Sequence, residues 1–418
     1  MPELPLVKCT GCGACVHLCT KKAISLSENQ EGFLYPKVDD NLCVNCGLCE
    51  KSCPVNQSGK IAENFSVRQA FACIANDEKI REKSSSGGMF TVLAEKIIEE
   101  GGIVFGAEFD EDFSVKFGWT ESVEGLGRFR GSKYLQARTE NSFSECKKFL
   151  EGGRKVLFTG TPCQIAGLKA FLKKEFENLY TVDFICHGVP SAELWQKYIK
   201  YREKKSASRT VKTAFRRKND GWKLYSLSFT FANDSEYRQS LTKDKYLQIF
   251  LKDNALRESC YRCSFRGDNH KSDLTIADFW GIESVYPDFF DDRGTSFLIV
   301  QSEKGKELFD SCTGRFKSKE TDFFKAVNFN PSYFKSPARK VKRNVFYKDF
   351  EKRGIDYLYR RFGRESLFFR FKHFVKRCLR FGKRIFSKLR EGLEHRRGVP
   401  ERSGGMERKR KCAKPDPK

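Results

Sequence analysis

Eight of the 17 cysteines in this sequence lie between positions 9 and 53, in two copies of one spacing. Both copies have the form CxxCxxCxxxC, and they run CTGCGACVHLC and CVNCGLCEKSCP. Cysteines two residues apart can turn their sulfurs inward from one tight loop, which is what a [4Fe-4S] cube requires. Glycine, alanine and serine fill the gaps, so backbone N–H groups can approach the cluster sulfurs. We therefore expect both copies to bind iron–sulfur clusters.

The doubled spacing is that of a bacterial two-cluster ferredoxin, in which the fourth cysteine of each copy crosses to the other cluster. Zinc usually takes paired CxxC units, and disulfides belong to oxidising compartments, so both alternatives fit the spacing poorly. Thr20 replaces the usual proline after the first copy, but all eight ligands are present. The pattern predicts a first cluster on Cys9, Cys12, Cys15 and Cys53, and a second on Cys43, Cys46, Cys49 and Cys19.

Four later cysteines form another possible ligand set. Cys163 lies near a predicted helix start in FTGTPCQIAGL, where the helix end lowers a thiol pKa. Cys186 follows a strand in DFICHGVPS, and CYRCSF supplies Cys260 and Cys263. Four thiolates make a complete set for a third [4Fe-4S] cluster, which is the interpretation we favour. Structural zinc, buried free cysteines and a thiol–disulfide centre at the CxxC pair are the alternatives.

The segments around these cysteines alternate between strand and helix patterns. QAFACIA, GGIVFGAEF, RKVLFTG and LYTVDF have the composition of strands, and MFTVLAEKIIEE, TPCQIAGLKAFL and VPSAELWQKYIKYREKK that of helices. This alternation predicts an α/β core. Residues 211–235 have the pattern of antiparallel strands, and the stretch between the two cysteine copies has the pattern of a hairpin. The expected fold class is α+β, with a ferredoxin-like two-cluster domain, a mixed α/β body and a basic helical tail.

The 418 residues are enough for two or three domains. Polar residues at 54–66 indicate a linker, and the composition changes again after the body. The expected divisions are a ferredoxin domain at 1–57, a body at 67–310, an edge-packing extension at 311–350, a basic amphipathic helical region at 351–398 and a disordered tail at 399–418.

The net charge of +24 is concentrated in one part of the chain, because residues 351–418 contain 23 Lys or Arg and 8 Asp or Glu. Elsewhere acidic and basic residues are mixed and no nucleic-acid module is evident, so we expect no nucleic-acid partner. Residues 365–390 form a basic amphipathic pattern, which predicts either peripheral contact with an anionic membrane or packing on protein. The absence of a long apolar run and of a secretory signal pattern predicts a cytoplasmic location.

Two glycine–serine turns lie where an α/β protein places its ligands, at junctions between strands and helices. KSSSGG spans residues 83–88 and combines hydroxyls and glycines at a helix start, so it can cradle a phosphate. The alternative is a helix cap with a flexible turn. GSKY spans residues 131–134 and offers a second such turn with a cation and an aromatic ring.

In their order along the chain, these motifs resemble the coenzyme F420 hydrogenase/dehydrogenase beta-subunit family. The resemblance covers about residues 1–305 and rests on SSSGG, GSKY, GTPCQIAGL, CHGVPS, FRRKNDGW, CYRCSF, DLTIADFWG and DDRGTSFLIV, after the cysteine pair. The family also includes reductases of chlorophyll intermediates and relatives encoded with bacterial polysaccharide-synthesis enzymes. It implies a flavoprotein in which FAD binds in the body and exchanges electrons with iron–sulfur clusters.

The resemblance also implies roles for particular residues. His187 is a candidate proton donor, although a buried, hydrogen-bonded histidine is the alternative. Asp278 and Trp280 of DFWG would support the pocket. No GxGxxG segment is present, so a nicotinamide site is not predicted. The flavin phosphate would lie at Ser85, Ser86, Gly87 and Gly88, the rest of the cofactor beside Gly131, Ser132, Lys133 and Tyr134, and the ring or third cluster near Thr161, Pro162 and His187.

The predicted function is that of an iron–sulfur flavoprotein oxidoreductase. Clusters move single electrons and organic substrates take two, so a flavin is needed between them. Electrons would pass between a low-potential carrier, such as ferredoxin or another subunit, and a two-electron substrate, either deazaflavin F420 or an organic intermediate. The alternatives are a non-catalytic electron-transfer subunit and a reductase of polysaccharide biosynthesis at the membrane.

Overall fold

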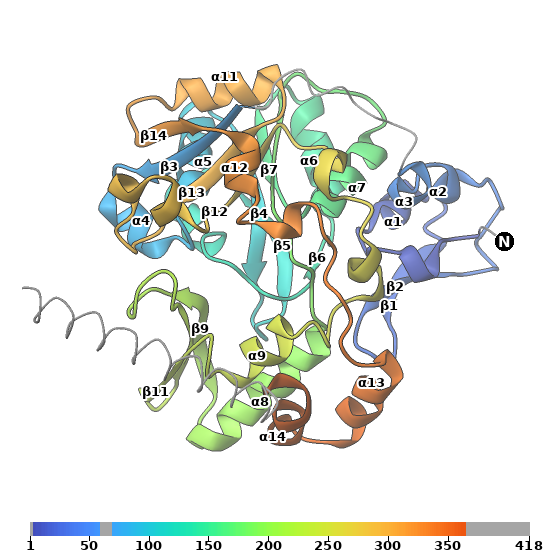
Figure 1. Ribbon diagram of the computed structural model, residues 1–418. Helices are drawn as coiled ribbons and strands as arrows, with labels where there is room; N and C mark the ends of the chain where they lie inside the picture. Colours follow the sequence, from blue (N-terminus) through green and yellow to red (C-terminus); the bar gives the residue numbers. More distant parts are fainter. Residues whose placement is uncertain (1–2, 59–68, 365–418) are drawn as a thin grey trace, which may run out of the picture. The chain divides into compact units, whose positions relative to one another are not determined.

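A nine-stranded mixed sheet forms the centre of the body. The computed structural model describes residues 3–58 and 69–364. The strands lie in the order β14-β3-β13-β12-β8-β7-β4-β5-β6 (Figure 1). Strands β4, β7, β8 and β12 are parallel, β5 and β13 run antiparallel to them, and β3 pairs antiparallel with β13. Their bounds are β3 Gln69–Ala75, β4 Ile103–Phe109, β5 Val115–Thr120, β6 Ala137–Arg138, β7 Val156–Thr159, β8 Leu179–Phe184, β12 Leu274–Asp278, β13 Ser296–Val300 and β14 Phe316–Thr321.

Helices cover both faces of this sheet, so its inner strands are buried on both sides. In β13, Phe297 and Ile299 belong to one core cluster and Leu298 and Val300 to another, as the two-residue period of a strand requires. The helices α5 (Met89–Glu99) and α11 (Glu303–Ser311) pack on one face, and α6 (Ser142–Glu151) and α7 (Pro162–Leu172) on the other. The predicted α/β rhythm is confirmed in these elements.

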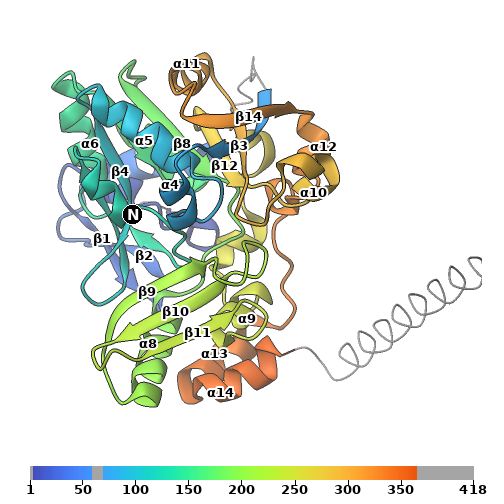
Figure 2. The same cartoon turned by 90° about the vertical axis from the view of Figure 1, so that its left-hand side faces the viewer.

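A smaller antiparallel sheet carries a second core. Its strands are β9 (Thr210–Arg217), β10 (Ser226–Phe231) and β11 (Glu236–Ser240), in the order β11-β10-β9, which confirms the strands predicted within 211–235. Figure 2 shows this sheet with α8 (Ala192–Ser206) and α9 (Lys245–Leu251) beside it. Trp195 on α8 is completely buried in this core.

The cysteine-rich segment at the N-terminus folds as a ferredoxin-like unit. The predicted hairpin is confirmed, since β1 (Ile24–Glu28) and β2 (Leu34–Val38) pair antiparallel. Short helices follow the cysteine loops: α1 (Ala14–Leu18), α2 (Leu48–Lys51) and α3 (Pro54–Gln57). Figure 1 shows α1 beside α7, and Phe33 at the hairpin is 1% exposed within the core of the smaller sheet.

The remaining segments are mostly short. Phe316–Thr321 forms the outermost strand of the large sheet, next to β3. The basic helix predicted at 365–390 lies outside the described residues. Across 3–58 and 69–364, no helix is both long and apolar enough to cross a membrane. The other elements are α4 Glu78–Lys83, α10 Ile282–Val285, α12 Phe323–Val327, α13 Arg343–Lys352, α14 Ile355–Leu358, the 3₁₀ turns η1 Leu6–Lys8, η2 Glu124–Arg128, η3 Glu258–Arg262, η4 Gly267–Asn269, η5 Pro287–Phe289 and η6 Pro331–Tyr333, and the π turn η7 Tyr359–Gly363.

Candidate iron–sulfur and cofactor site

The structure brings together the four cysteines predicted to hold the first cluster, which we call the first thiol set: Cys9, Cys12, Cys15 and Cys53. Burial, followed by the neighbouring charges of Cys9 and Cys53, raises the pKa of Cys15 to about 12. Burial also raises the pKa of Cys12, with smaller contributions from Cys15 and Cys9. The backbone N–H of Gly11 donates to Cys9 Sγ at 3.4 Å. Cys53 reaches this set from the second copy of the spacing, as the crossed pattern requires.

The second thiol set, Cys43, Cys46, Cys49 and Cys19, is closer to the surface. Burial is the main cause of a raised pKa at Cys49, and Cys46 and Cys19 add to it, so these three thiols are neighbours. Cys46 is exposed. The N–H of Ala23 donates to Cys19 Sγ at 3.3 Å, and Cys43 Sγ donates to Asn45 Oδ1 at 3.8 Å. An electron carrier outside the chain can therefore reach this set directly.

The third thiol set consists of Cys163, Cys186, Cys260 and Cys263, and all four line one cavity of about 40 Å³. Burial raises the pKa of Cys163 to about 12, with Cys263 and Cys260 contributing as well. Burial likewise raises the pKa of Cys186, followed by Cys260 and Cys163. The structure thus gathers four thiols from α7, from the loop after β8 and from η3 and its C-cap.

The chemistry of these donor sets fits iron–sulfur clusters. All 15 cysteines in the described residues are free, so no disulfide joins them there. Buried thiolates are costly unless a cation offsets their charge, and cluster iron supplies that cation. Backbone N–H groups already point at sulfurs in all three sets, including that of Phe265, which donates to Cys263 Sγ at 3.4 Å. In the described residues, no three Cys, His, Asp or Glu side chains are gathered closely enough to hold one single metal ion.

The first and third thiol sets meet at helix α7. Thr161 begins this helix with a capping box to Gln164, and Cys163 occupies its first turn. One turn later, Gly167 packs against Cys12: a Cβ at this glycine would lie 2.9 Å from Cys12 Cβ and 3.1 Å from Cys12 Sγ. Cys163 also contributes to the raised pKa of Cys12, after burial and the nearer cysteines. The absence of a side chain at Gly167 allows the two sets to approach one another.

We expect Gly167→Val to destabilise the first cluster. The added side chain would overpack the contact with Cys12, at a cost of about 1–3 kcal/mol, and would push the cysteine loop away from α7. The measurement is the rate of iron release to a chelator under anaerobic conditions, which should rise. Gly127→Val is the matched control, because a Cβ at Gly127 has no atom within 4 Å. Equal release rates in the two variants would contradict the expectation.

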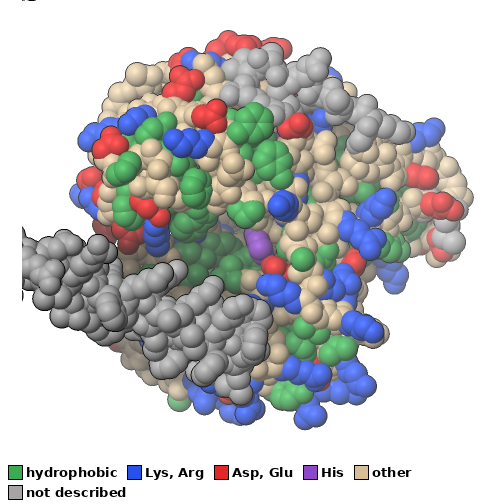
Figure 3. Space-filling model, viewed as in Figure 1, with side chains coloured by type: hydrophobic (Ala, Val, Ile, Leu, Met, Phe, Trp, Pro, Cys, Tyr) green, Lys and Arg blue, Asp and Glu red, His purple; other side chains and the backbone are tan. Residues whose placement is uncertain are grey.

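A cavity of about 710 Å³ lies at the carboxyl ends of β7 and β8, where α/β proteins bind ligands. Its volume is within the range of cofactor pockets. Apolar side chains line a hollow on the face seen in Figure 3, between the large-sheet and small-sheet parts. Gly87 is not among the residues that line the cavity, and Pro162 lines the smaller cavity instead. The predicted residues that do line it are Ser85, Ser86, Gly88, Gly131, Ser132, Lys133, Tyr134, Thr161, Cys163, Cys186 and His187.

The two glycine–serine turns are joined at the cavity wall. The backbone N–H and the hydroxyl of Ser132 donate to Ser85 Oγ at 2.7 and 2.9 Å. Gly87 packs against the sheet, where a Cβ would lie 2.3 Å from the carbonyl oxygen of Cys73. Lys133 Nζ donates to three carbonyls of its own turn, at residues 129–131, and burial lowers the pKa of Lys133 to about 7. Lys133 therefore stabilises the conformation of its own turn.

Arg216 on β9 connects the predicted motifs. It lies in FRRKNDGW, a motif to which the sequence analysis gave no site residue. Its guanidinium donates to both carboxylate oxygens of Asp278 at 2.9 Å, to the Ser85 carbonyl at 3.0 Å and to the Tyr134 hydroxyl at 3.2 Å. Arg216 lines the large cavity, and its Nε is buried without a hydrogen-bond partner in the described part of the chain. Trp280 stacks on Trp222 at 4.8 Å, so Asp278 and Trp280 both support this wall.

His187 follows Cys186 at the same cavity and is paired on both ring nitrogens. Nε2 lies 2.6 Å from Asp253 Oδ1, and Nδ1 lies 3.3 Å from Ser332 Oγ. The side chain is half-buried, and its ring meets Phe250 edge-on at 5.4 Å. A carboxylate beside Nε2 favours a proton on that nitrogen. Sequence patterns pointed to His187 and missed both partners, which come from segments far along the chain.

The N-terminal part of the sequence matches a known domain model. Residues 8–57 match the 4Fe-4S dicluster domain. Together with the grouping of its cysteines, this match defines the chain as an iron–sulfur electron-transfer protein of mixed α/β fold with a ferredoxin-like N-terminal domain.

Residues 153–322 match the model that describes the C terminus of the coenzyme F420 hydrogenase/dehydrogenase beta subunit. This match confirms the resemblance that was predicted from the motifs.

Two individual proteins also match parts of the chain. The F subunit of the F(420)H(2) dehydrogenase of Methanosarcina mazei is 26% identical over 165 residues, which cover 37% of this chain and 46% of that protein. The match thus spans a little under half of the curated relative. A chain of the structure titled "Xenon derivatization of the F420-reducing [NiFe] hydrogenase complex from Methanosarcina barkeri" is 18% identical, with 71% of this chain and 92% of that chain covered and a TM-score of 0.43. A TM-score below 0.5 does not establish a shared fold.

Proposed function

We propose that this chain is an iron–sulfur flavoprotein oxidoreductase that passes electrons between a low-potential carrier and a two-electron substrate. One observation carries the proposal: a single cavity of about 710 Å³ is lined both by the glycine–serine turns and by Cys163 and Cys186 of the third thiol set. FAD bound there would supply the conversion between one-electron and two-electron transfer. The family match supports this class of reaction.

The residues around the cavity fit the parts of a dinucleotide. Helix α5 starts at Met89, and Gly88, Met89 and Phe90 at its N-terminus line the cavity, so its free N–H groups can bind phosphate. Ser85 and Ser86 add hydroxyls beside it. Lys83, the cation of this motif, is exposed and does not line the cavity, whereas the partly buried Arg130 and the buried Arg216, which is paired with Asp278, do.

The chain's own side chains would orient the cofactor and handle the proton. His187 lies at the cavity wall with Asp253 on one ring nitrogen and Ser332 on the other. This arrangement fixes the ring and directs the Nε2 proton at Asp253, so His187 as the proton donor would have to exchange this hydrogen bond for one to the substrate. The apolar lining of the cavity would keep bulk water from the reacting atoms.

We further propose ferredoxin or a neighbouring subunit as the electron partner, and deazaflavin F420 or an organic intermediate as the two-electron substrate. The family description and the name of the curated relative both refer to F420. Iron–sulfur clusters favour a reducing compartment, which supports a cytoplasmic location. Peripheral membrane contact through residues 365–390 remains part of the proposal and lies outside the described residues.

The test is anaerobic reconstitution of the full chain with counts of iron, sulfide and flavin, followed by stopped-flow mixing with reduced ferredoxin and with reduced F420. The proposal expects about twelve irons and about one FAD per chain, and reduction of the flavin by at least one donor. Iron without any flavin would favour the alternative, a non-catalytic electron-transfer subunit.

We expect Ser85→Ala to weaken FAD retention. The substitution removes the oxygen that accepts both hydrogen bonds from Ser132, so the two turns lose their connection. The loss should be roughly tenfold in dissociation constant, which corresponds to about 1.4 kcal/mol for these bonds. Flavin fluorescence during titration of the deflavinated protein measures it. Ser122→Ala, in an exposed turn, should bind FAD as the wild type does. Equal FAD affinities in the two variants would show that the two turns do not contribute to FAD binding.

A further inference from the structure

A single buried arginine, Arg257, connects the ferredoxin-like unit to the third thiol set. It is 0% exposed. Its backbone N–H donates to the Val189 carbonyl at 2.9 Å, and its own carbonyl accepts from the N–H of Cys260 at 3.0 Å. Val189 lies three residues after Cys186, so the backbone of Arg257 is fixed by loops that carry two members of the third set.

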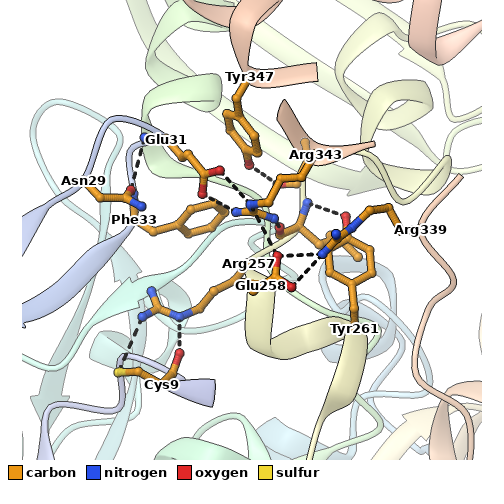
Figure 4. A network of polar contacts seen from close by, with 12 residues as sticks. Cys9, Asn29, Glu31, Phe33, Arg257, Glu258, Tyr261, Arg339, Arg343 and Tyr347 are labelled. Carbon is orange, nitrogen blue, oxygen red and sulfur yellow. Dashed lines mark hydrogen bonds and ion pairs between the residues drawn. The ribbon is translucent and has the colours of Figure 1, made fainter. Parts of the chain in front are cut away.

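The side chain of Arg257 points the other way, toward the first thiol set. Nε donates to the Cys9 carbonyl at 2.7 Å, and Nη2 donates to Cys9 Sγ at 3.7 Å (Figure 4). Nη1 donates to Gln136 Oε1 at 3.0 Å, and the amide of Gln136 donates in turn to the Thr10 carbonyl at 3.2 Å. The guanidinium therefore holds the loop that begins the first set.

The charge of Arg257 is not matched by a carboxylate. Across the described ranges 3–58 and 69–364, no Asp or Glu forms an ion pair with it, and its face lies 4.2 Å from the ring of Tyr35. The adjacent Glu258 pairs with Arg339 and Arg343 instead (Figure 4). A buried cation without a counter-charge is costly. A cluster bound through Cys9 carries net negative charge and would provide that counter-charge.

We propose that Arg257 is a positioning residue that raises the reduction potential of the first cluster above that of the second. This inference rests on the proposed binding of both clusters. Reduction adds one negative charge to a cluster, and a guanidinium at Cys9 Sγ in a buried site favours that extra charge. In the described part of the chain, no Lys or Arg side chain donates to a sulfur of the second set, where Cys19 and Cys43 interact with Ala23 and Asn45.

The consequence is a direction for internal electron transfer. One electron leaves the second cluster, which is oxidised, and reduces the first, with no bond or proton changing place. The exposed second set receives electrons, and the first set retains them beside α7 and the third set. The same side chain thus fixes the position of the first set and biases where an electron resides.

A matched control is available in the same interface. Arg343 Nε donates to Glu31 Oε1 at 2.6 Å and Nη1 to the Leu256 carbonyl at 2.8 Å, so it also holds the ferredoxin-like hairpin on the body. Figure 4 shows both arginines in one network, but the contacts of Arg343 go to Glu31, Glu258 and Leu256 and not to a cysteine. Arg343→Gln loosens the interface without removing the cation beside Cys9.

The test is a redox titration followed by electron paramagnetic resonance on the full-length, anaerobically reconstituted chain. We expect Arg257→Gln to lower the midpoint potential of the first cluster and to leave that of the second unchanged, and Cys9→Ser identifies the signal of the first cluster. The third set is not the reference, because Arg257 also acts on Cys163 and Cys260. Arg257→Lys retains the charge and should stay near the wild-type potential. Arg343→Gln should leave all midpoints unchanged.

Three results would overturn the inference: unchanged midpoints in an iron-replete Arg257→Gln variant, an equal shift in Arg257→Lys, or the same shift in Arg343→Gln. If Arg257→Gln loses the first cluster, Arg257→Lys provides the test. A first cluster that is retained in Arg257→Lys with a near-wild-type midpoint potential supports the role of the charge, and a lowered midpoint potential in this variant contradicts it. A wild-type chain without clusters would contradict the proposed function itself, and the iron count separates that failure from the others.

Discussion

Replacing Arg216 by alanine should lower the free energy of unfolding by about 3–5 kcal/mol. The Arg216 side chain is 4% exposed and the Asp278 side chain 17%, so the substitution leaves a largely buried carboxylate without its cation. The hydrogen bonds to Ser85 and Tyr134 are lost at the same time, which separates the walls of the large cavity. Chemical denaturation of the anaerobic holoprotein measures the change, and FAD content should fall with it.

The next residue provides the control. Arg217 is exposed and lies 3.6 Å from Glu236, which is exposed as well. Surface pairs of this kind contribute about 0–1 kcal/mol, so Arg217→Ala should be nearly neutral and should keep its flavin. Similar losses of stability in the two variants would show that the buried pair contributes no more to the free energy of unfolding than the surface pair.

Replacing Cys260 by alanine should reduce the iron content from about twelve to about eight per chain. The N-terminal clusters should still accept electrons from dithionite, but the proposed flavin should be reduced through them more slowly, because Cys163 neighbours Cys12 and lines the large cavity together with Cys186. Iron analysis and stopped-flow absorbance measure the two effects.

Cys146→Ala is the control for this substitution, since Cys146 is a buried cysteine of α6 that belongs to none of the three sets. Its iron content should stay near that of the wild type. A wild-type chain with about eight irons and one zinc would refute the third cluster, and Cys260→Ala would then release the zinc.

Local sequence patterns predicted much of the fold because their physical causes are local. The strand composition of QAFACIA in β3, the helix pattern of TPCQIAGLKAFL in α7 and the cysteine spacing all act over a few neighbouring positions. The spacing alone also predicted that Cys53 crosses to the first set, and the structure has Cys53 beside Cys15.

The contacts that the sequence did not predict join residues that lie far apart along the chain. Arg257 meets Cys9, 248 positions away, and Arg216 meets Ser85, 131 positions away. Nothing in the neighbourhood of an arginine specifies such a contact. The sequence also did not show that Lys83 of the KSSSGG motif is exposed at the end of α4 and does not line the large cavity.

The buried position of Phe33 bears on how the chain handles electrons over time. With this ring 1% exposed inside the core of the smaller sheet, the ferredoxin-like unit is part of the body and is not a tethered shuttle. In the proposed function, transfer between the N-terminal clusters and the third set would therefore require no diffusive search, and the rate of that step should not depend on solvent viscosity. The proposed arrival of an electron at exposed Cys46 would depend on collision with another molecule.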